Sequence, residues 1–193
     1  MKTEIAEKAG FCFGVARAVK IARENAGDGG SAVTYGMLIH NRDVTEELKE
    51  LGVGIVNSVD EINPGTNVII RAHGIPADEE EAIKNRGANI IDATCPYVKK
   101  IHSIVSGAAE SGADIIIVGD PKHPEVKGIN GRCLGRGHII NSVEEAEQIK
   151  PNILSNDVVI VAQTTLRKDF FKKIEKILKK HFTNVNFFDT ICT

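Results

Sequence analysis

Short runs of β-branched and aliphatic residues alternate along the chain with segments in which apolar residues recur at helical spacing. The runs predict strands at Glu4–Ala6, Ala32–Tyr35, Val68–Arg71, Asn89–Ile91, Asp114–Val118, His138–Ile140, Val158–Ala162 and Val185–Phe188. The segments between them predict helices over Val15–Asn25, Val44–Leu51, Asp78–Arg86, Val98–Glu110, Val143–Ile149 and Leu166–His181. Strands that alternate with helices are typical of βαβ units, so we predict an α/β fold with mainly parallel sheets.

Residues at several helix ends fit this pattern. Asp78 is expected to open one helix, and Ser142 followed three residues later by Glu145 forms a capping-box pattern at the start of another. Gly52 and Gly87 follow two other helices, where glycine commonly ends a helix.

The sequence also contains an internal repeat. Cys12 and Cys95 each precede a predicted helix, and a histidine follows each cysteine after 28 residues, at His40 and His123. Each histidine lies four residues after a glycine that ends a predicted strand. Two copies of one design are therefore present.

The second half of each copy shows the same correspondence. A strand that runs into a polar turn follows in both, VIIRAHG in the first and VIVAQTT in the second, so His73 corresponds to Thr164. Each copy then closes on a strand and a cysteine, in IIDATC at Cys95 and FFDTIC at Cys192. The repeated residues all follow strands, and ligands of open α/β sheets bind beyond the carboxyl ends of the strands.

The repeat divides the chain into residues 1–95 and 96–193, and we expect each unit to fold as a small α/β lobe. If the units pack as a ring, their cysteines converge on one point. A third unit would begin at Cys192, as the second begins at Cys95. We therefore expect a third lobe that this sequence, which ends at Thr193, does not include.

Composition narrows the classes of protein that fit. Of the 193 residues, 42% are hydrophobic, which is enough for a core, and the formal net charge of −2 argues against a nucleic-acid or anionic-membrane surface. No apolar run reaches the roughly 18 residues of a membrane span, and no apolar segment of the export type follows the N-terminus. We expect a cytoplasmic protein.

Three cysteines at equivalent positions, Cys12, Cys95 and Cys192, favour a metal centre. Separated thiolates bind zinc or an iron–sulfur cluster, and structural zinc usually takes closely spaced pairs and four ligands. A 4Fe-4S cluster held by three cysteines leaves one iron open for substrate. The alternative is that these cysteines are simply buried, as cysteines often are. Cys133 has no counterpart in the repeat, and we interpret it as structural or incidental.

His40, His73 and His123 each follow a strand and sit beside small or turn residues. Imidazoles gathered in a pocket can donate hydrogen bonds to phosphate oxygens. The alternative is that each of the three is an ordinary loop histidine. Asn41 and Arg71 are further candidates that could assist the histidines, although their spacing does not require it. We assign no function to the remaining histidines, which are His102, His138 and His181.

Glu125 lies two residues after His123, and a carboxyl beside a cluster and an anionic ligand would have a raised pKa and pass a proton. The alternative is a surface glutamate at a helix start. Thr164 and Thr165 offer hydroxyl donors, or else they cap the helix that begins near Leu166.

The last predicted helix carries seven basic residues against Asp169 and Glu175. These residues are Arg167, Lys168, Lys172, Lys173, Lys176, Lys179 and Lys180. Such a run is usually a solvated face, and the functional alternative is a dock for an acidic electron carrier. The sequence contains neither a dinucleotide-binding nor a P-loop motif.

Seven motifs in order, G-F-C-F-G-V, G-x-L-I-H-N, R-A-H-G, D-A-T-C-P, H-P-E-V, A-Q-T-T and T-I-C, resemble one family along the whole chain. It is the family of 4-hydroxy-3-methylbut-2-enyl diphosphate reductases, also called LytB/IspH proteins, the last enzymes of the methylerythritol phosphate route to isoprenoids. The resemblance implies three α/β lobes in a trefoil around an oxygen-sensitive 4Fe-4S cluster. It covers about two-thirds of the usual enzyme, without the family's third lobe and the serine and asparagine residues that this lobe adds to the diphosphate site.

The resemblance also implies residue roles. Cys12, Cys95 and Cys192 would be the cluster ligands, with one iron left open. His40, His73 and His123 would form the diphosphate site, and Glu125 would supply the proton to the leaving hydroxyl, with His123 also in a catalytic role. Thr164 would position the substrate hydroxyl and help the proton network, and Thr165 would also contact the substrate. The reaction implied is a two-electron reductive dehydroxylation that yields isopentenyl and dimethylallyl diphosphate, with electrons from ferredoxin or flavodoxin.

Two other functions remain open at this point. One is a 4Fe-4S hydro-lyase, in which the open iron acts only as a Lewis acid and no electrons are consumed. The other is an inactive two-lobe module, and we expect these 193 residues alone to be inactive or nearly so. Some members of the family carry RNA-binding S1 domains, which this sequence neither shows nor excludes.

Overall fold

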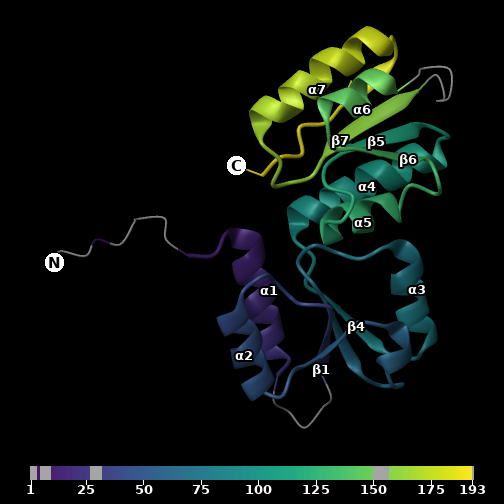
Figure 1. Ribbon diagram of the computed structural model, residues 1–193. Coiled ribbons are helices and arrows are strands. Elements are labelled where there is room, and N and C mark those ends of the chain that lie inside the picture. The colour runs from purple at the N-terminus through teal and green to yellow at the C-terminus, as the bar shows by residue number, and fades with distance from the viewer. Residues whose placement is uncertain (1–3, 5–9, 27–31, 150–156, 193) are drawn as a thin grey trace.

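The chain folds into two four-stranded parallel sheets, which follow one another along the sequence (Figure 1). The computed structural model describes residue 4 and residues 10–26, 32–149 and 157–192. The first half contains α1 (Phe13–Glu24), β1 (Ala32–Tyr35), α2 (Arg42–Glu50), β2 (Gly54–Val56), the 3-10 turn η1 (Val59–Glu61), β3 (Asn67–Ile70), α3 (Ala77–Asn85) and β4 (Asn89–Asp92). The second half contains α4 (Pro96–Glu110), β5 (Asp114–Val118), α5 (Pro124–Asn130), β6 (Gly137–Ile140), α6 (Val143–Gln148), β7 (Val158–Ala162), α7 (Lys168–His181) and β8 (Val185–Phe187).

The two sheets have the same topology. The first has the order β2-β1-β3-β4 and the second β6-β5-β7-β8, so each strand of one half has a counterpart in the other. Within the described residues, all six strand pairings are parallel. The predicted α/β fold with parallel sheets is therefore confirmed, and the repeat seen in the sequence appears as a repeat of structure.

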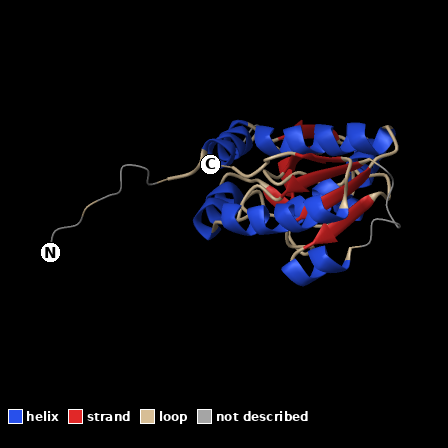
Figure 2. Ribbon diagram, turned by 90° about the horizontal axis from the view of Figure 1, so that it is seen from above, coloured by secondary structure: helices blue, strands red, loops and turns tan. Residues whose placement is uncertain are grey.

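Helices cover both faces of each sheet, as the view from above shows (Figure 2). In the first half, α1 and α2 pack on one face and α3 on the other. In the second half, α4 and α5 pack on one face and α6 and α7 on the other. Strands covered on both faces need apolar side chains throughout, and every residue of β5 and β7 is buried.

Most elements lie within two residues of their predicted positions, and β1, β5 and β7 have the predicted bounds. The sequence did not predict β2 and α5. β2 is a three-residue edge strand, and α5 is a seven-residue helix that starts at Pro124, so neither is long enough to show a period. The predicted strand Glu4–Ala6 includes residues outside the described part of the chain.

The predicted helix ends are correct at three of four places. Ser142 Oγ accepts the Glu145 N–H at 3.1 Å, and Gly52 and Gly87 follow their helices with φ of 85° and 75°. The prediction for Asp78 was wrong: α3 begins at Ala77, and the residue that caps it is Pro76. Because Pro76 is held in an extended conformation, the helix starts earlier, and Asp78 lies in its first turn.

No helix in the described part of the chain is long and apolar enough to cross a membrane.

Candidate active site

Three cysteines from distant parts of the sequence meet at one cavity of about 130 Å³ between the two halves of the chain. Cys12 immediately precedes α1, Cys95 immediately precedes α4, and Cys192 follows β8. Cys12 and Cys192 are exposed and Cys95 is half-buried. The spacing of the sequence repeat therefore corresponds to a real gathering of thiols.

Backbone contacts place two of these cysteines. The Cys95 N–H donates to the Ala72 carbonyl at 2.9 Å, and the Cys192 N–H donates to the Thr164 carbonyl at 2.7 Å. Gly14, in the first turn of α1, lies directly against Cys95, and a Cβ at this position would collide with the Cys95 Sγ. A glycine is needed here because the thiol packs against the helix backbone.

The three predicted histidines also come together. Their ring centroids are 5.1 Å apart for His40 and His73, 5.3 Å for His73 and His123, and 6.3 Å for His40 and His123. One ring nitrogen of each lies within 4.8 Å of the others. His40 follows β1, His73 follows β3 and His123 follows β5, so the carboxyl ends of three strands supply one cluster.

The surroundings indicate the tautomer of His123 and the protonation state of His73. His123 Nδ1 accepts the Glu125 N–H at 3.2 Å, so the proton of the neutral ring is on Nε2, which makes that atom a donor. Burial, together with the nearby His123 and His40, lowers the pKa of His73 to about 4. His73 is therefore neutral at pH 7.

Glu125 and Thr164 form a buried pair beside the cysteines. The Thr164 N–H donates to Glu125 Oε1 and the Thr164 hydroxyl donates to Glu125 Oε2, both at 2.6 Å. The exposed fraction is 2% for Glu125 and 8% for Thr164. Both residues line the cysteine cavity, as do His73 and Thr165. The cavity therefore joins the thiols, one histidine and a carboxyl group held by a hydroxyl.

Other residues singled out in the sequence have different surroundings. The helix cap before α7 is Arg167, so neither Thr164 nor Thr165 occupies the cap position. Asn41 caps α2 by accepting the Val44 N–H. Arg71 Nε donates to the Gly74 carbonyl and so braces the loop that carries His73.

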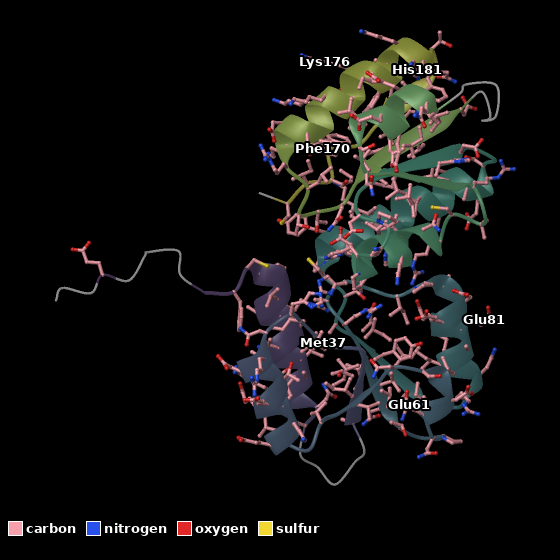
Figure 3. The ribbon with its side chains drawn as sticks, in the orientation of Figure 1. Met37, Glu61, Glu81, Phe170, Lys176 and His181 are labelled. Carbon is pink, nitrogen blue, oxygen red and sulfur yellow. The ribbon has the colours of Figure 1, made fainter. Side chains whose placement is uncertain are left out.

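Cys133 and two of the remaining histidines lie apart from the thiols. Cys133 is fully buried in the second half, and burial raises the pKa of its thiol to about 12. His138 contacts Asp114, and His181 contacts the Ile149 carbonyl. Lys176 lies on the outer side of α7 (Figure 3), while Phe171, Ile174 and Leu178 form the buried side of that helix.

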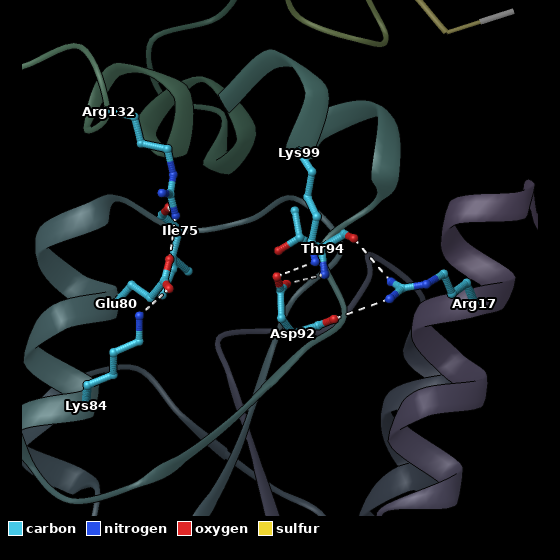
Figure 4. Close-up of polar contacts among 8 residues, drawn as sticks. All are labelled: Arg17, Ile75, Glu80, Lys84, Asp92, Thr94, Lys99 and Arg132. Atoms are coloured by element: carbon cyan, nitrogen blue, oxygen red, sulfur yellow. Dashed lines mark hydrogen bonds and ion pairs between the residues drawn. The ribbon is translucent and has the colours of Figure 1, made fainter. Parts of the chain in front are cut away.

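The two halves are joined behind the His73 loop. Arg132, which follows α5, donates to Glu80 of α3 at 2.6 Å and to the Ile75 carbonyl at 3.3 Å (Figure 4). His102 of α4 is buried against Gly74, where a Cβ would collide with its ring. These contacts hold the loop of His73 against the half that carries His123. The role of His102 cannot be predicted from the sequence, because it depends on packing between the two halves.

The sequence profile of the family described as "LytB protein" matches residues 3–193. The chain belongs to the LytB family. A relative named 4-hydroxy-3-methylbut-2-enyl diphosphate reductase, from Campylobacter hominis, is 42% identical over all of this chain and 68% of its own length. A relative of the same name from Caldanaerobacter subterraneus subsp. tengcongensis is also 42% identical, over 67% of its length.

Solved structures of reductases agree with this membership. The (E)-1-hydroxy-2-methyl-but-2-enyl-4-diphosphate reductase of Plasmodium falciparum has a TM-score of 0.88 at 28% identity and covers 96% of this chain and 59% of its own. A second structure, of the (E)-4-hydroxy-3-methyl-but-2-enyl diphosphate reductase that is the terminal enzyme of the non-mevalonate pathway, has a TM-score of 0.82 at 41% identity, over 98% of this chain. This LytB chain spans about two-thirds of the length of its curated relatives.

Proposed function

We propose that this LytB chain carries the cluster site and substrate site of a 4-hydroxy-3-methylbut-2-enyl diphosphate reductase. The observation that carries the proposal is the convergence of three cysteines, His73 and the buried Glu125–Thr164 pair on one cavity. The names of the relatives supply the substrate, and the oxidoreductase class follows from the same names. The reaction is the last step of the non-mevalonate route to isoprenoids.

Cys12, Cys95 and Cys192 would hold a 4Fe-4S cluster. Three thiols at the rim of one cavity are a suitable donor set for such a cluster, and the packing of Cys95 on Gly14 supports a thiol fixed in place. The resemblance of the sequence motifs to the reductase family implies the same cluster. When bound, the cluster supplies electrons together with one iron that has no protein ligand.

The three histidines would bind the diphosphate. The Nε2–H of His123 is a donor because its Nδ1 accepts from the backbone, and imidazole N–H groups pair well with phosphate oxygens. Thr164 and Thr165 would add hydroxyl groups at the opposite end of the substrate, beside the cysteines.

Glu125 would donate the proton that lets the hydroxyl group leave as water. The carbon–oxygen bond of the allylic alcohol breaks, two electrons enter the substrate, and a second proton adds to the allylic carbon to give isopentenyl or dimethylallyl diphosphate. Thr164 holds both oxygens of the Glu125 carboxyl group, so the threonine orients the acid and connects it to the cavity.

We further propose that residues 1–95 and 96–193 are two lobes of a trefoil, which the matching order of their two sheets supports. Electrons would come from ferredoxin or flavodoxin. A cytoplasmic location would suit the thiol ligands, because they need a reducing compartment.

The test is the substitution Glu125→Gln in the full-length protein, reconstituted with iron and sulfide and reduced with dithionite and methyl viologen. Glutamine can accept the Thr164 N–H and donate to its hydroxyl, so the fold and the iron content should be retained while most turnover is lost. Glu144→Gln, on the exposed side of α6, is the matched control. Unchanged turnover in Glu125→Gln would remove the proton role, and turnover without any reductant would indicate a hydro-lyase instead.

A further inference from the structure

The short segment between β4 and Cys95 is folded into a tight turn. Asp92 Oδ1 accepts the Thr94 N–H at 2.9 Å, and Lys99 of α4 donates to Asp92 Oδ2 at 2.5 Å (Figure 4). Lys99 lies one helical turn after Cys95. The helix that follows Cys95 therefore contacts the turn that precedes this cysteine through the ion pair between Lys99 and Asp92.

A second cation reaches the same turn from α1. Arg17 Nη1 donates to the Thr94 carbonyl at 3.2 Å, and Arg17 Nη2 lies 3.5 Å from the Asp92 carbonyl oxygen. Arg17 lies five residues after Cys12, on the helix that this cysteine precedes. The turn before Cys95 is thus held between the two helices that follow Cys12 and Cys95.

The repeat places a similar turn and a similar cation near the next cysteine, Cys192. Asp189 Oδ1 accepts the Ile191 N–H at 3.3 Å, which forms the corresponding turn before Cys192. Lys100 lies five residues after Cys95, the position that Arg17 has after Cys12. Lys100 lines a cavity of about 170 Å³ together with Asp189 and Ile191, so a cation faces this turn as well.

The ion pair between Lys99 and Asp92 contributes little to folding stability. The Lys99 and Asp92 side chains are 45% and 42% exposed, and exposed ion pairs contribute about 0–1 kcal/mol. The contacts of Lys99 and Arg17 nevertheless act on the few residues that separate the end of β4 from Cys95. A displacement of this turn would move the Cys95 thiol directly.

We propose that Arg17 and Lys99 are positioning residues: they hold the turn before Cys95 and so fix the position of the Cys95 thiol relative to Cys12. We propose that Lys100 holds the turn before Cys192 in the same way. The inference deepens the proposed function and rests on it, since it assumes that the three thiols bind one centre. Partners that orient metal ligands are worth about 10- to 100-fold in metal affinity.

The test uses Co²⁺ as a probe of the thiols in the anaerobic, cluster-free chain. Thiolate-to-cobalt charge transfer and the d–d bands report the affinity and the geometry of the site without any turnover. Arg17→Gln and Lys99→Met are expected to weaken Co²⁺ binding about tenfold each and to shift the d–d bands. Arg17→Lys, which keeps one donor, should recover part of the affinity.

The controls separate this inference from the proposed function. Lys20→Gln removes an exposed cation of α1 that forms an ion pair with Glu24 of the same helix, and it should change neither the affinity nor the spectrum. Cys95→Ser removes one of the three thiols and should weaken the charge-transfer band. If wild type and Cys95→Ser give the same spectrum, the proposed thiol site fails, and the inference with it. If Cys95→Ser weakens the band but Arg17→Gln and Lys99→Met bind like wild type at unchanged melting temperature, the positioning role alone is wrong.

Discussion

Acidification is expected to weaken the junction between the two halves through His102. This imidazole is 7% exposed, and burial, reinforced by the nearby Arg132 charge, lowers its pKa from 6.5 to about 4. In the unfolded chain His102 takes up a proton below about pH 6.5, whereas in the folded chain it stays neutral until about pH 4. The unfolded state therefore binds more protons in this window, and the free energy of unfolding falls as the pH is lowered through it.

The size of the effect follows from the two pKa values. One pKa unit corresponds to about 1.4 kcal/mol, so the full contribution is about 3 kcal/mol, of which about 2 kcal/mol is lost between about pH 7 and pH 5. The assay is urea unfolding followed by circular dichroism at a series of pH values, for wild type and His102→Gln. The variant cannot take up the proton, so its stability should fall by about 2 kcal/mol less over the same range.

His102→Asn is a second neutral replacement with a different shape, and it controls for effects of side-chain shape on the pH dependence. It should show the same shallow pH dependence whatever its stability at neutral pH. If wild type and both variants lose the same free energy on acidification, the buried, neutral His102 is not the cause, and the account of the junction is wrong.

Two further substitutions probe the cavity itself. Gly14→Ala should lower the iron bound on reconstitution, because its Cβ would collide with the Cys95 Sγ and displace the thiol. Gly107→Ala, in a helix with open space around it, is the control that should keep its iron. Thr164→Val should lower the free energy of unfolding by about 1.5–3 kcal/mol in urea titrations, because it removes a hydrogen bond to the buried Glu125, while Thr164→Ser stays near wild type; equal losses in both would contradict this.

How far the sequence predicted the fold depended on burial. The runs Asp114–Val118 and Val158–Ala162 are covered on both faces, so their uninterrupted apolar character marked the strand bounds. The pattern does not predict the helix Pro124–Asn130, because this helix is seven residues long and its cap is His123, which is not among the usual capping residues. Its start depends on the contact between His123 Nδ1 and the Glu125 N–H, which no periodicity reveals.

The candidate site was predictable to the extent that it repeats. Equal spacing predicted that Cys12 and Cys95 occupy equivalent places, and the structure brings both to one cavity. Contacts made across the repeat were not predictable in the same way. Gly14 packs on Cys95, and Arg17 donates a hydrogen bond to the Thr94 carbonyl. Each contact joins residues more than 75 positions apart, so only the folded chain shows it.

The most direct test of the central claim is the iron and acid-labile sulfide bound per chain after anaerobic reconstitution. The measurement compares wild type with Cys12→Ser, Cys95→Ser and Cys192→Ser, and uses Cys133→Ser, in the buried core, as the control. The account predicts about four irons per chain in wild type and in the control, with a marked loss in each of the other three variants. Equal iron in wild type and Cys192→Ser, or little iron in wild type itself, would contradict the claim that these three thiols hold the cluster.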